Sequence, residues 1–307
     1  MDEVKIAYVI AVHKNPQQFS RLVDRLNGSH ADFFVHVDKK SPINEFKNSI
    51  KAIAQDNFYF IKQFNAAWSE FGIVEAEIQA LKDIVNKGKH YDMIILLSGQ
   101  DYPIKSNDYI KIFFHKWKGK SFIESFPMPF QPWPNGGMDR INRYHFKILG
   151  KSFSYPPYKQ AKGAVRKILN GLFGLYFKER SLPLGMKPFG GEHWWNFNME
   201  TARYIVQFLE QHPEFIDFHK FSFCADEMFF QTLLRNSTGK SIYDNIINDD
   251  LRYYDWSEGK DSPKTFTLLD LENLTISEKL FARKFDPNLD NKILDELDKV
   301  IQINYQN

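Results

Sequence analysis

The N-terminal part of the chain alternates between short apolar segments and segments in which apolar side chains recur at helical spacing. Residues 5–12 are β-branched and apolar nearly throughout, which is typical of a strand covered on both faces. Further strand-like segments at 33–38, 58–61 and 91–97 are separated by helical patterns. This alternation predicts βαβ units and therefore an α/β fold with a central, mostly parallel sheet flanked by helices.

Polar residues follow three of the predicted strands, at 13–15, 38–40 and 98–103. In an open parallel sheet, ligands bind beyond the carboxyl ends of the strands, so these segments are expected to converge on one site. Each carboxylate also has a simpler explanation. Asp38 and Asp101 stand where turns begin, and Asp is common in turns.

The composition argues against several classes of protein. Forty Lys and Arg residues against 38 Asp and Glu give a net charge of +2, so no nucleic-acid partner is expected. The longest apolar runs, such as 94–97, are too short to span a membrane. The N-terminus has no basic leader region, and Cys224 is the only cysteine, so no internal disulfide can form. We therefore expect a cytoplasmic protein.

A basic segment covers residues 147–187, where nine Lys and Arg residues face one acid, Glu179. Between 165 and 176 its apolar residues recur at helical spacing. We interpret this pattern as a core-facing helix with a solvated basic face. The alternative is a peripheral contact with an anionic membrane, at its inner face.

Familiar nucleotide and metal motifs are missing from the sequence. There is no Gly-x-Gly-x-x-Gly, no P-loop, no His-Glu-x-x-His, no Gly-x-Ser-x-Gly and no Asp-x-Asp pair. We therefore expect no metal and no cofactor. If the chain handles a diphosphate, cationic side chains have to neutralise it instead.

Aromatic residues make up 16% of the chain, and some stand beside glycines or charges in the C-terminal half. Residues 190–195 place two glycines before Trp194 and Trp195, where rings could stack on a ligand or simply fill a core strand. Residues 250–256 mix charges with Tyr254 and Trp256, as sugar-binding sites do and as plain edge strands also do.

Seven motifs in order resemble the core-2/I-branching glycosyltransferases, which include branching β-1,6-N-acetylglucosaminyltransferases and peptide O-xylosyltransferases. The resemblance covers the chain from Lys5 to Phe285. The motifs are Ala-Val-His (11–13), Val-His-Val-Asp-Lys-Lys-Ser (35–41), Ala-Trp-Ser (67–69), Leu-Ser-Gly-Gln-Asp-Tyr-Pro-Ile (97–104), Gly-Gly-Glu-His-Trp-Trp (190–195), Ala-Asp-Glu-Met-Phe-Phe-Gln-Thr (225–232) and Leu-Phe-Ala-Arg-Lys-Phe (280–285).

The resemblance implies a bacterial-type enzyme with a GT-A-type fold that transfers a sugar from a UDP-sugar with inversion and without a metal. A single domain, 1–307, is expected to contain a nucleotide-binding half (1–120), an acceptor and catalytic half (121–285) and a C-terminal helix (286–307). By position, Glu227 matches the general base that deprotonates the acceptor hydroxyl, a role that suits a carboxylate.

Further roles carry over from the resemblance. Lys264 and Lys284 match the basic pair that neutralises the diphosphate. The expected donor-binding residues are Val12, His13, Asp38 and Asp101. The expected acceptor contacts are Glu124, Arg140, Trp194, Trp195, Tyr254 and Trp256.

The resemblance does not fix the sugar or the acceptor. We expect UDP-N-acetylglucosamine as donor, with UDP-xylose as the alternative. The expected acceptor is a glycan, free or lipid-linked, in polysaccharide biosynthesis. Two other classes stay open: a glycoside hydrolase, for which no suitable pair of carboxylates is evident, and a non-catalytic carbohydrate-binding protein.

Overall fold

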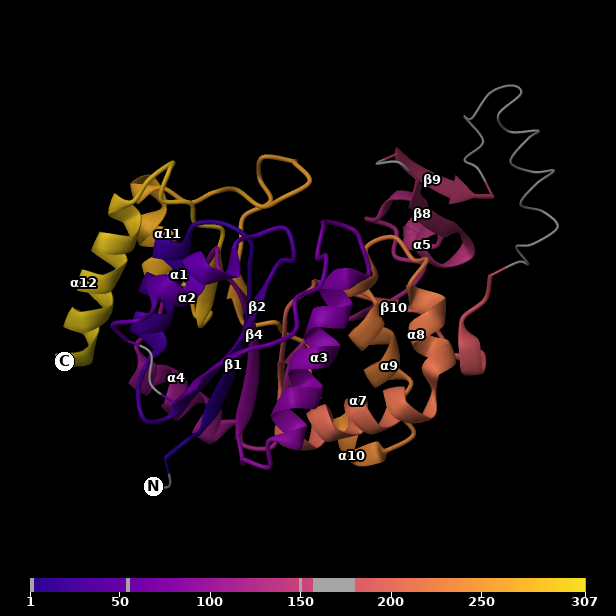
Figure 1. Cartoon of the computed structure of the whole chain (residues 1–307), viewed down its shortest axis with the longest axis horizontal. Helices are drawn as coiled ribbons and strands as arrows, with labels where there is room; N and C mark the ends of the chain where they lie inside the picture. The colour runs from indigo at the N-terminus through magenta and orange to yellow at the C-terminus, as the bar shows by residue number, and fades with distance from the viewer. Residues whose placement is uncertain (1–2, 54–55, 149–150, 157–179, 307) are drawn as a thin grey trace.

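A seven-stranded sheet runs through the centre of the computed structural model, which describes residues 3–53, 56–148, 151–156 and 180–306 (Figure 1). The strand order is β12-β6-β11-β4-β1-β2-β3, and all pairings are parallel except the two that β11 makes. The α/β fold with a mostly parallel sheet is therefore confirmed. The strands are β1 (Ile6–Val12), β2 (Ala31–Val37), β3 (Phe58–Phe60), β4 (Met93–Ser98), β6 (Ser121–Ile123), β11 (Trp195–Phe197) and β12 (Ile246–Ile247).

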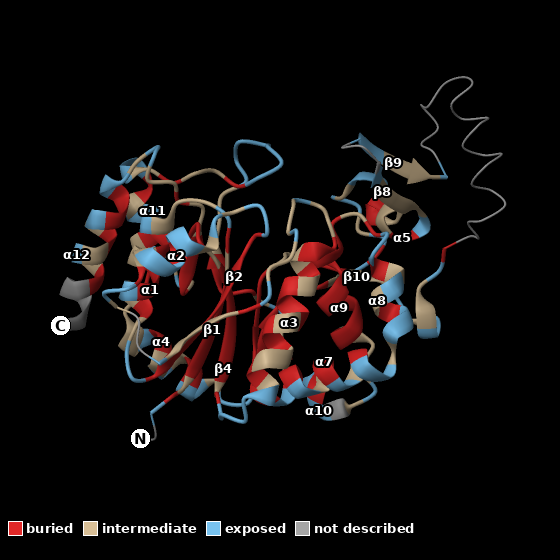
Figure 2. Ribbon diagram, viewed as in Figure 1, coloured by how far each residue is buried: buried red, intermediate tan, exposed pale blue. Residues whose placement is uncertain are grey.

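Helices cover both faces of this sheet, and two separate apolar cores lie between sheet and helices. One core contains side chains of α1, α4, α11 and α12, and the other contains side chains of α3, α7 and α9. The central strands are buried along nearly their whole length (Figure 2). The helices are α1 (Pro16–Leu26), α2 (Ile43–Ser49), α3 (Gly72–Asn86), α4 (Asn107–Lys116), α5 (Asp139–Asn142), α7 (Met199–Gln211), α8 (Pro213–His219), α9 (Phe229–Arg235), α10 (Lys240–Asp244), α11 (Leu271–Ile276) and α12 (Lys292–Gln306).

The strand order creates a switch point between β1 and β4. From β1 the chain adds β2 and β3 on one side, and then crosses to place β4 on the other side of β1. The order of the strands therefore reverses between β1 and β4, which lie next to each other in the sheet. Crevices that form beside such a reversal, at the carboxyl edge of the sheet, are where α/β proteins bind their ligands.

A small second sheet lies beyond this edge and joins distant parts of the chain. Its order is β13-β14-β5, formed by Arg252–Tyr253, Phe281–Arg283 and Asp101–Pro103. The antiparallel register pairs Arg283 with Asp101, so a C-terminal strand docks directly after β4. The described residues contain two further antiparallel pairs: β7 (Phe126–Pro127) with β10 (Phe189–Gly190), which are far apart in the sequence, and the hairpin of β8 (Tyr144–Ile148) with β9 (Lys151–Tyr155).

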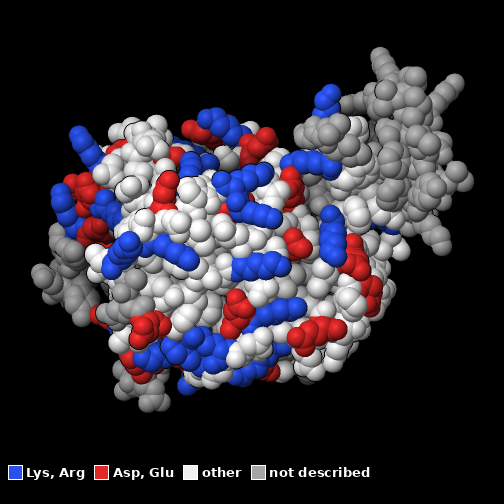
Figure 3. Space-filling model, in the orientation of Figure 1, with Lys and Arg blue, Asp and Glu red and all other residues white. Residues whose placement is uncertain are grey.

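Most of the basic segment, residues 157–179, lies outside the described residues. Of its described bases, Arg180 is buried and its guanidinium donates to the backbone carbonyls of Arg143, Phe218 and Phe221. On the face shown in Figure 3, Lys and Arg are interspersed with Asp and Glu. Across the described residues, the helices are all too short or too polar to cross a membrane.

The C-terminal helix α12 begins at Lys292 and is joined to the N-terminal half by two carboxylates, Asp295, which pairs with Arg21 at 2.7 Å, and Asp298. Asp298 accepts hydrogen bonds from Arg21 Nη2 at 2.7 Å and from Tyr102 Oη at 2.9 Å. Arg21 belongs to α1 and Tyr102 to β5, so α12 is bonded both to α1 and to the small sheet. Removing a partly buried carboxylate that serves several donors costs each of them one acceptor, although Arg21 keeps its ion pair with Asp295.

We therefore predict that Asp298→Ala lowers the free energy of unfolding by about 1–3 kcal/mol, because Arg21 and Tyr102 lose a shared acceptor. Urea unfolding followed by circular dichroism measures this. Asp217→Ala is the control, since Asp217 is exposed and pairs only with Lys220, and it should change stability by less than about 0.5 kcal/mol. Equal stability of the two variants would contradict the prediction.

Candidate active site

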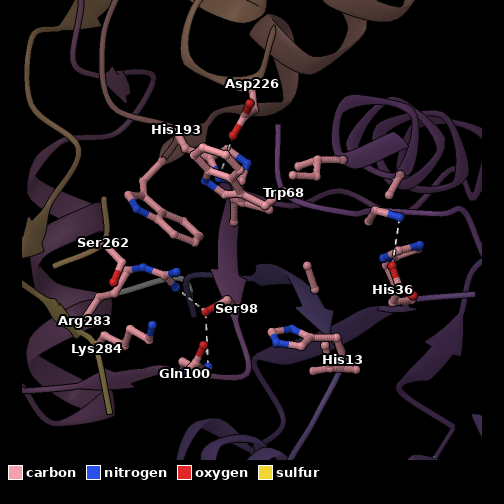
Figure 4. Close-up of a pocket in the computed structure, with 18 of the residues that line it drawn as sticks. His13, His36, Trp68, Ser98, Gln100, His193, Asp226, Ser262, Arg283 and Lys284 are labelled. Carbon is pink, nitrogen blue, oxygen red and sulfur yellow. Dashed lines mark hydrogen bonds and ion pairs between the residues drawn. The ribbon is translucent and has the colours of Figure 1, made fainter. Parts of the chain in front are cut away.

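A cavity of about 690 Å³ opens at the carboxyl edge of the large sheet, at the switch point between β1 and β4 (Figure 4). Its floor includes the end of β1, the residues after β2 and β4, and two residues at the end of β14. Helix α3 and the turn before α9 form the opposite wall. The predicted residues that line the cavity are Val12, His13, Asp38, Trp194, Glu227, Tyr254, Trp256 and Lys284.

Five predicted residues do not line the cavity. Asp101, Arg140 and Glu124 each contact a residue that does. Trp195 and Lys264 lie in other surroundings, described below.

Two adjacent cations, Arg283 and Lys284, line the cavity together. Lys284 was predicted and Arg283 was not, although both stand in the motif 280–285. Lys284 forms no ion pair with any residue that the structure describes. Burial, Arg283 and Lys14 lower the pKa of Lys284 below its usual range. A cation in this position is stabilised when an anion binds beside it.

Asp101 positions Arg283 instead of facing the cavity. Its carboxylate is fully buried and lies 3.0 Å from Arg283 Nη1. Ser98 Oγ donates to the same carboxylate at 2.8 Å and accepts from Arg283 at 2.6 Å. The predicted contact of Asp101 with the donor sugar is therefore replaced by an ion pair that orients Arg283.

Lys264 points away from the cavity. Its Nζ donates to Asp270 Oδ1 at 2.6 Å, and Asp270 also caps the turn at Leu268–Asp270. The neighbouring Ser262 and Pro263 line the cavity, but Lys264 does not. The structure thus places Arg283, and not Lys264, beside Lys284 as the second cation.

The two adjacent tryptophans are both buried in the same apolar core, but they differ in their other contacts. Trp194 lines the cavity, with the Arg283 guanidinium 4.7 Å from its ring centroid. Trp195 is fully buried and stacks on Phe197, so it cannot contact an acceptor as predicted.

The glycines before these tryptophans serve a close approach within the protein. A Cβ at Gly191 would lie 2.0 Å from the backbone carbonyl of Glu124. The Gly191 N–H donates to the Glu227 carbonyl at 2.9 Å. Gly191 therefore permits a close approach between segments of the protein itself.

Glu227 ends a short 3₁₀ turn, Ala225–Glu227, instead of standing inside helix α9. Its carboxylate lines the cavity and forms an ion pair with Arg140, whose guanidinium lies 3.8 Å from the ring centroid of Trp133. Burial and the neighbouring Asp226 raise the pKa of Glu227, while Arg140 opposes this shift. A raised pKa makes this carboxylate a stronger base than an exposed glutamate.

A second carboxyl group, Glu192, lines the cavity and was not predicted. Burial and the charges of Glu227, Asp250 and Glu124 raise the pKa of Glu192 to about 8. Glu124 accepts a hydrogen bond from Tyr254 Oη at 3.4 Å, from behind the cavity wall. The carboxyl groups of Glu192, Glu227 and Glu124 therefore lie close enough to influence one another.

Aromatic rings stand at the mouth of the cavity. Trp68, for which no role was predicted, lines the cavity with 63% of its surface exposed. Trp256 is also exposed, and its ring lies edge-on to the ring of Tyr254 with 6.2 Å between the ring centroids. Exposed rings at a cavity mouth are suited to contacts with sugar faces.

Asp38 holds the cavity wall together. Its two carboxylate oxygens accept hydrogen bonds from the backbone N–H groups of Lys40 and Ala66, both at 2.8 Å. These bonds join the turn after β2 to the loop that carries Trp68. Its predicted contact with a nucleoside stays a prediction.

Among the described residues, no three His, Cys, Asp or Glu side chains are grouped to hold a metal ion. The cationic groups that line the cavity in the described part of the chain are His13, His36, Lys40, His193, Arg283 and Lys284, counting each histidine in its protonated form.

The model of the family described as "Branch: Core-2/I-Branching enzyme" matches residues 6–280 of the chain. The observed mostly parallel sheet agrees with the GT-A-type fold that the sequence resemblance implies.

Curated relatives are similar over almost the whole chain. Xylosyltransferase 2 of Rattus norvegicus is 24% identical over 323 residues, which cover 96% of this chain and 33% of that protein. A xylosyltransferase of Ciona intestinalis is 22% identical and is covered over 34% of its length. The chain thus spans about a third of the length of the curated relatives it matches. The crystal structure of mouse xyloside xylosyltransferase 1, apo form, is 10% identical, with a TM-score of 0.39 over 91% of this chain and 97% of that one.

Proposed function

The chain belongs to the core-2/I-branching enzyme family, and from that premise we propose that it is an inverting, metal-independent glycosyltransferase. It transfers a sugar from a UDP-sugar to a hydroxyl group of a glycan acceptor. One observation carries the proposal: a single cavity at the switch point contains both the Arg283–Lys284 pair and the Glu227 carboxylate.

The cavity is electrostatically polarised in the way this reaction requires. Arg283 and Lys284 stand on the floor, where a diphosphate binds beyond the strand ends. Glu227 comes from the opposite wall, formed by the turn before α9. The sugar lies between the two groups, so that the acceptor attacks on the side opposite the leaving UDP.

The chemistry is a direct displacement. The acceptor oxygen forms a bond to the anomeric carbon as the bond from that carbon to the diphosphate oxygen breaks. Glu227 takes the hydroxyl proton, and the electron pair of the broken bond leaves with UDP. Arg283 and Lys284 stabilise the charge that develops on the diphosphate, which is the task a metal performs in other sites.

Arg140 keeps the Glu227 carboxylate ionised and directs it. The ion pair uses Glu227 Oε2, and Arg140 is held in turn against Trp133. Arg140 was predicted to contact the acceptor. We propose instead that it acts on the acceptor indirectly, through its ion pair with Glu227. Glu124 similarly acts through Tyr254.

The sugar we propose is N-acetylglucosamine, transferred in the cytoplasm to a free or lipid-linked glycan. Xylose is the second candidate, because the curated relatives named above are xylosyltransferases. In both cases the exposed rings of Trp68 and Trp256 are placed to contact sugar.

Turnover should persist without divalent metal. Purified protein is incubated with UDP-N-acetylglucosamine or UDP-xylose and an oligosaccharide acceptor panel, in EDTA, and UDP release is measured. We expect rates within about twofold of those with added magnesium, because Arg283 and Lys284 carry the diphosphate charge. Loss of turnover in EDTA contradicts metal independence, and absence of UDP release with every donor contradicts the proposed function.

Glu227→Gln should lower kcat at least about 10²-fold and leave UDP affinity nearly unchanged, since glutamine keeps the shape but cannot take the proton. Steady-state rates and calorimetric UDP binding measure the two effects. Glu210→Gln on the exposed face of α7 is the control and should be silent. Turnover of Glu227→Gln close to wild type would remove Glu227 from its role.

Lys284 and Lys264 should differ sharply. Lys284→Ala is expected to raise the KM for the UDP-sugar by about 10²-fold, because an unpaired cation in the cavity is lost. Lys264→Ala should change it by less than about threefold, since Lys264 serves Asp270. The reverse order of effects would show that Lys264 turns into the cavity when the donor binds.

A further inference from the structure

His193 lies between two carboxylates at the wall of the cavity (Figure 4). Its Nε2 is 2.5 Å from Glu77 Oε1 on α3, and its Nδ1 is 3.6 Å from Asp226 Oδ2 in the turn before α9. The imidazole therefore connects a long, well-packed helix to the short turn that ends in Glu227.

Glu77 is only 3% exposed, and both of its oxygens are occupied. Oε1 faces His193, and Oε2 accepts a hydrogen bond from Trp195 Nε1 at 2.9 Å. A buried carboxylate is costly unless a cation compensates it. Burial alone would lower the pKa of His193, but Glu77 and Asp226 raise it to about 9, so His193 is the compensating cation.

The same loop holds the turn by two separate attachments. The Gly191 N–H donates to the Glu227 carbonyl, and His193 faces the side chain of Asp226. Asp226 Oδ1 is buried and has no hydrogen-bond partner in the described residues. Burial raises the pKa of Asp226, and the His193 cation is the main influence that opposes this shift and favours the Asp226 carboxylate.

The protonation of His193 and Glu227 also depends on the other charged groups around them. His193 is faced by Glu77 and Asp226 and is repelled by Arg283. The charged neighbours of Glu227 are Asp226, Arg140 and His193, and the carboxyl group of Glu192 also lines its side of the cavity.

We propose that His193 is a positioning residue, held as a cation by Glu77, that fixes the Asp226–Glu227 turn and favours the ionised form of Glu227. This inference rests on the proposed function of Glu227 as a base. His193 itself does not contact the reacting atoms, and its effect is transmitted through Asp226 and Glu227.

The proposal has a specific pH signature. The His193 cation lowers the pKa of Glu227, so neutralising His193 raises that pKa and leaves less ionised Glu227 on the acidic side. Above about pH 9 the wild-type His193 is itself neutral. The difference between wild type and a variant that lacks the cation must therefore be large at acidic pH and vanish at alkaline pH.

Glu77→Gln is the most conservative test, because glutamine can still accept from Trp195 and can donate to a neutral His193. We expect kcat to fall by about tenfold near pH 6 and to lie within about twofold of wild type near pH 9. His193→Gln should give the same pH profile of kcat. The double variant should have a kcat no lower than that of the less active single variant, since the two residues act as a unit.

Asp32→Asn is the matched control. Asp32 is a buried carboxylate that accepts from Tyr91 Oη at 2.5 Å and pairs with Lys89, but it lies at the amino end of β2, away from the cavity. It should lower stability without changing the shape of the pH profile. A Glu77→Gln profile that runs parallel to wild type at every pH, as for Asp32→Asn, overturns the proposal.

A second measurement needs no turnover. Nitrogen-15 NMR of the histidine rings should show one imidazole, assigned through His193→Gln, that stays protonated at neutral pH in wild type and loses its proton in Glu77→Gln. If the wild-type protein binds UDP but transfers no sugar, the proposed function is refuted. A His193 ring that stays protonated at neutral pH would still support its role in fixing the Asp226–Glu227 turn. Titration of His193 at the ordinary histidine pKa of about 6.5 overturns the inference in either case.

Discussion

The ion pair between Asp101 and Arg283 determines how the two sheets of this protein fit together. Asp101 follows β4 and is fully buried, so its charge must be compensated from within the protein. Arg283 supplies that compensation from a strand far along the chain, at a register that makes the two residues direct partners. The docking of β14 next to β5 is therefore fixed electrostatically as well as by backbone hydrogen bonds. Lys284, the next residue, is carried into the cavity as a consequence.

The positions of the cationic and acidic groups within the cavity follow from this arrangement. The Arg283–Lys284 pair is placed where the small sheet meets the switch point of the large sheet. Glu192 and Glu227 come from the segments that precede β11 and α9, which the Gly191 N–H joins by its bond to the Glu227 carbonyl. Because the two sides are built from different layers, their charges are kept apart without mutual neutralisation. Such separation is needed where one substrate brings a diphosphate and the other brings a hydroxyl proton.

The sequence patterns predicted the features of the structure that depend on residues close together in the chain. The strands and helices of the N-terminal half follow from apolar periodicity, and the position of the cavity follows from the carboxyl edge of a parallel sheet. The sequence alone does not separate Trp194 from Trp195, because Trp194 lies before β11 and both rings belong to the same apolar core. The partners of Lys264 and Arg140 were not predictable in this way, because Asp270 and Glu227 are brought to them by loops with no periodic pattern. Glu77 carried a weak signal, as an acid within the apolar face of α3.

The basicity of Glu227 is best understood as a balance between opposing neighbours. Burial and Asp226 raise its pKa, which strengthens it as a base, whereas Arg140 and His193 lower its pKa, which keeps it ionised. A carboxylate with only the first two influences would hold its proton and could not accept another. With only the last two it would be ionised but weakly basic. Because the two cations come from α5 and from the loop before β11, and each is held by contacts outside the turn, the balance is built into the fold and does not depend on bound substrate.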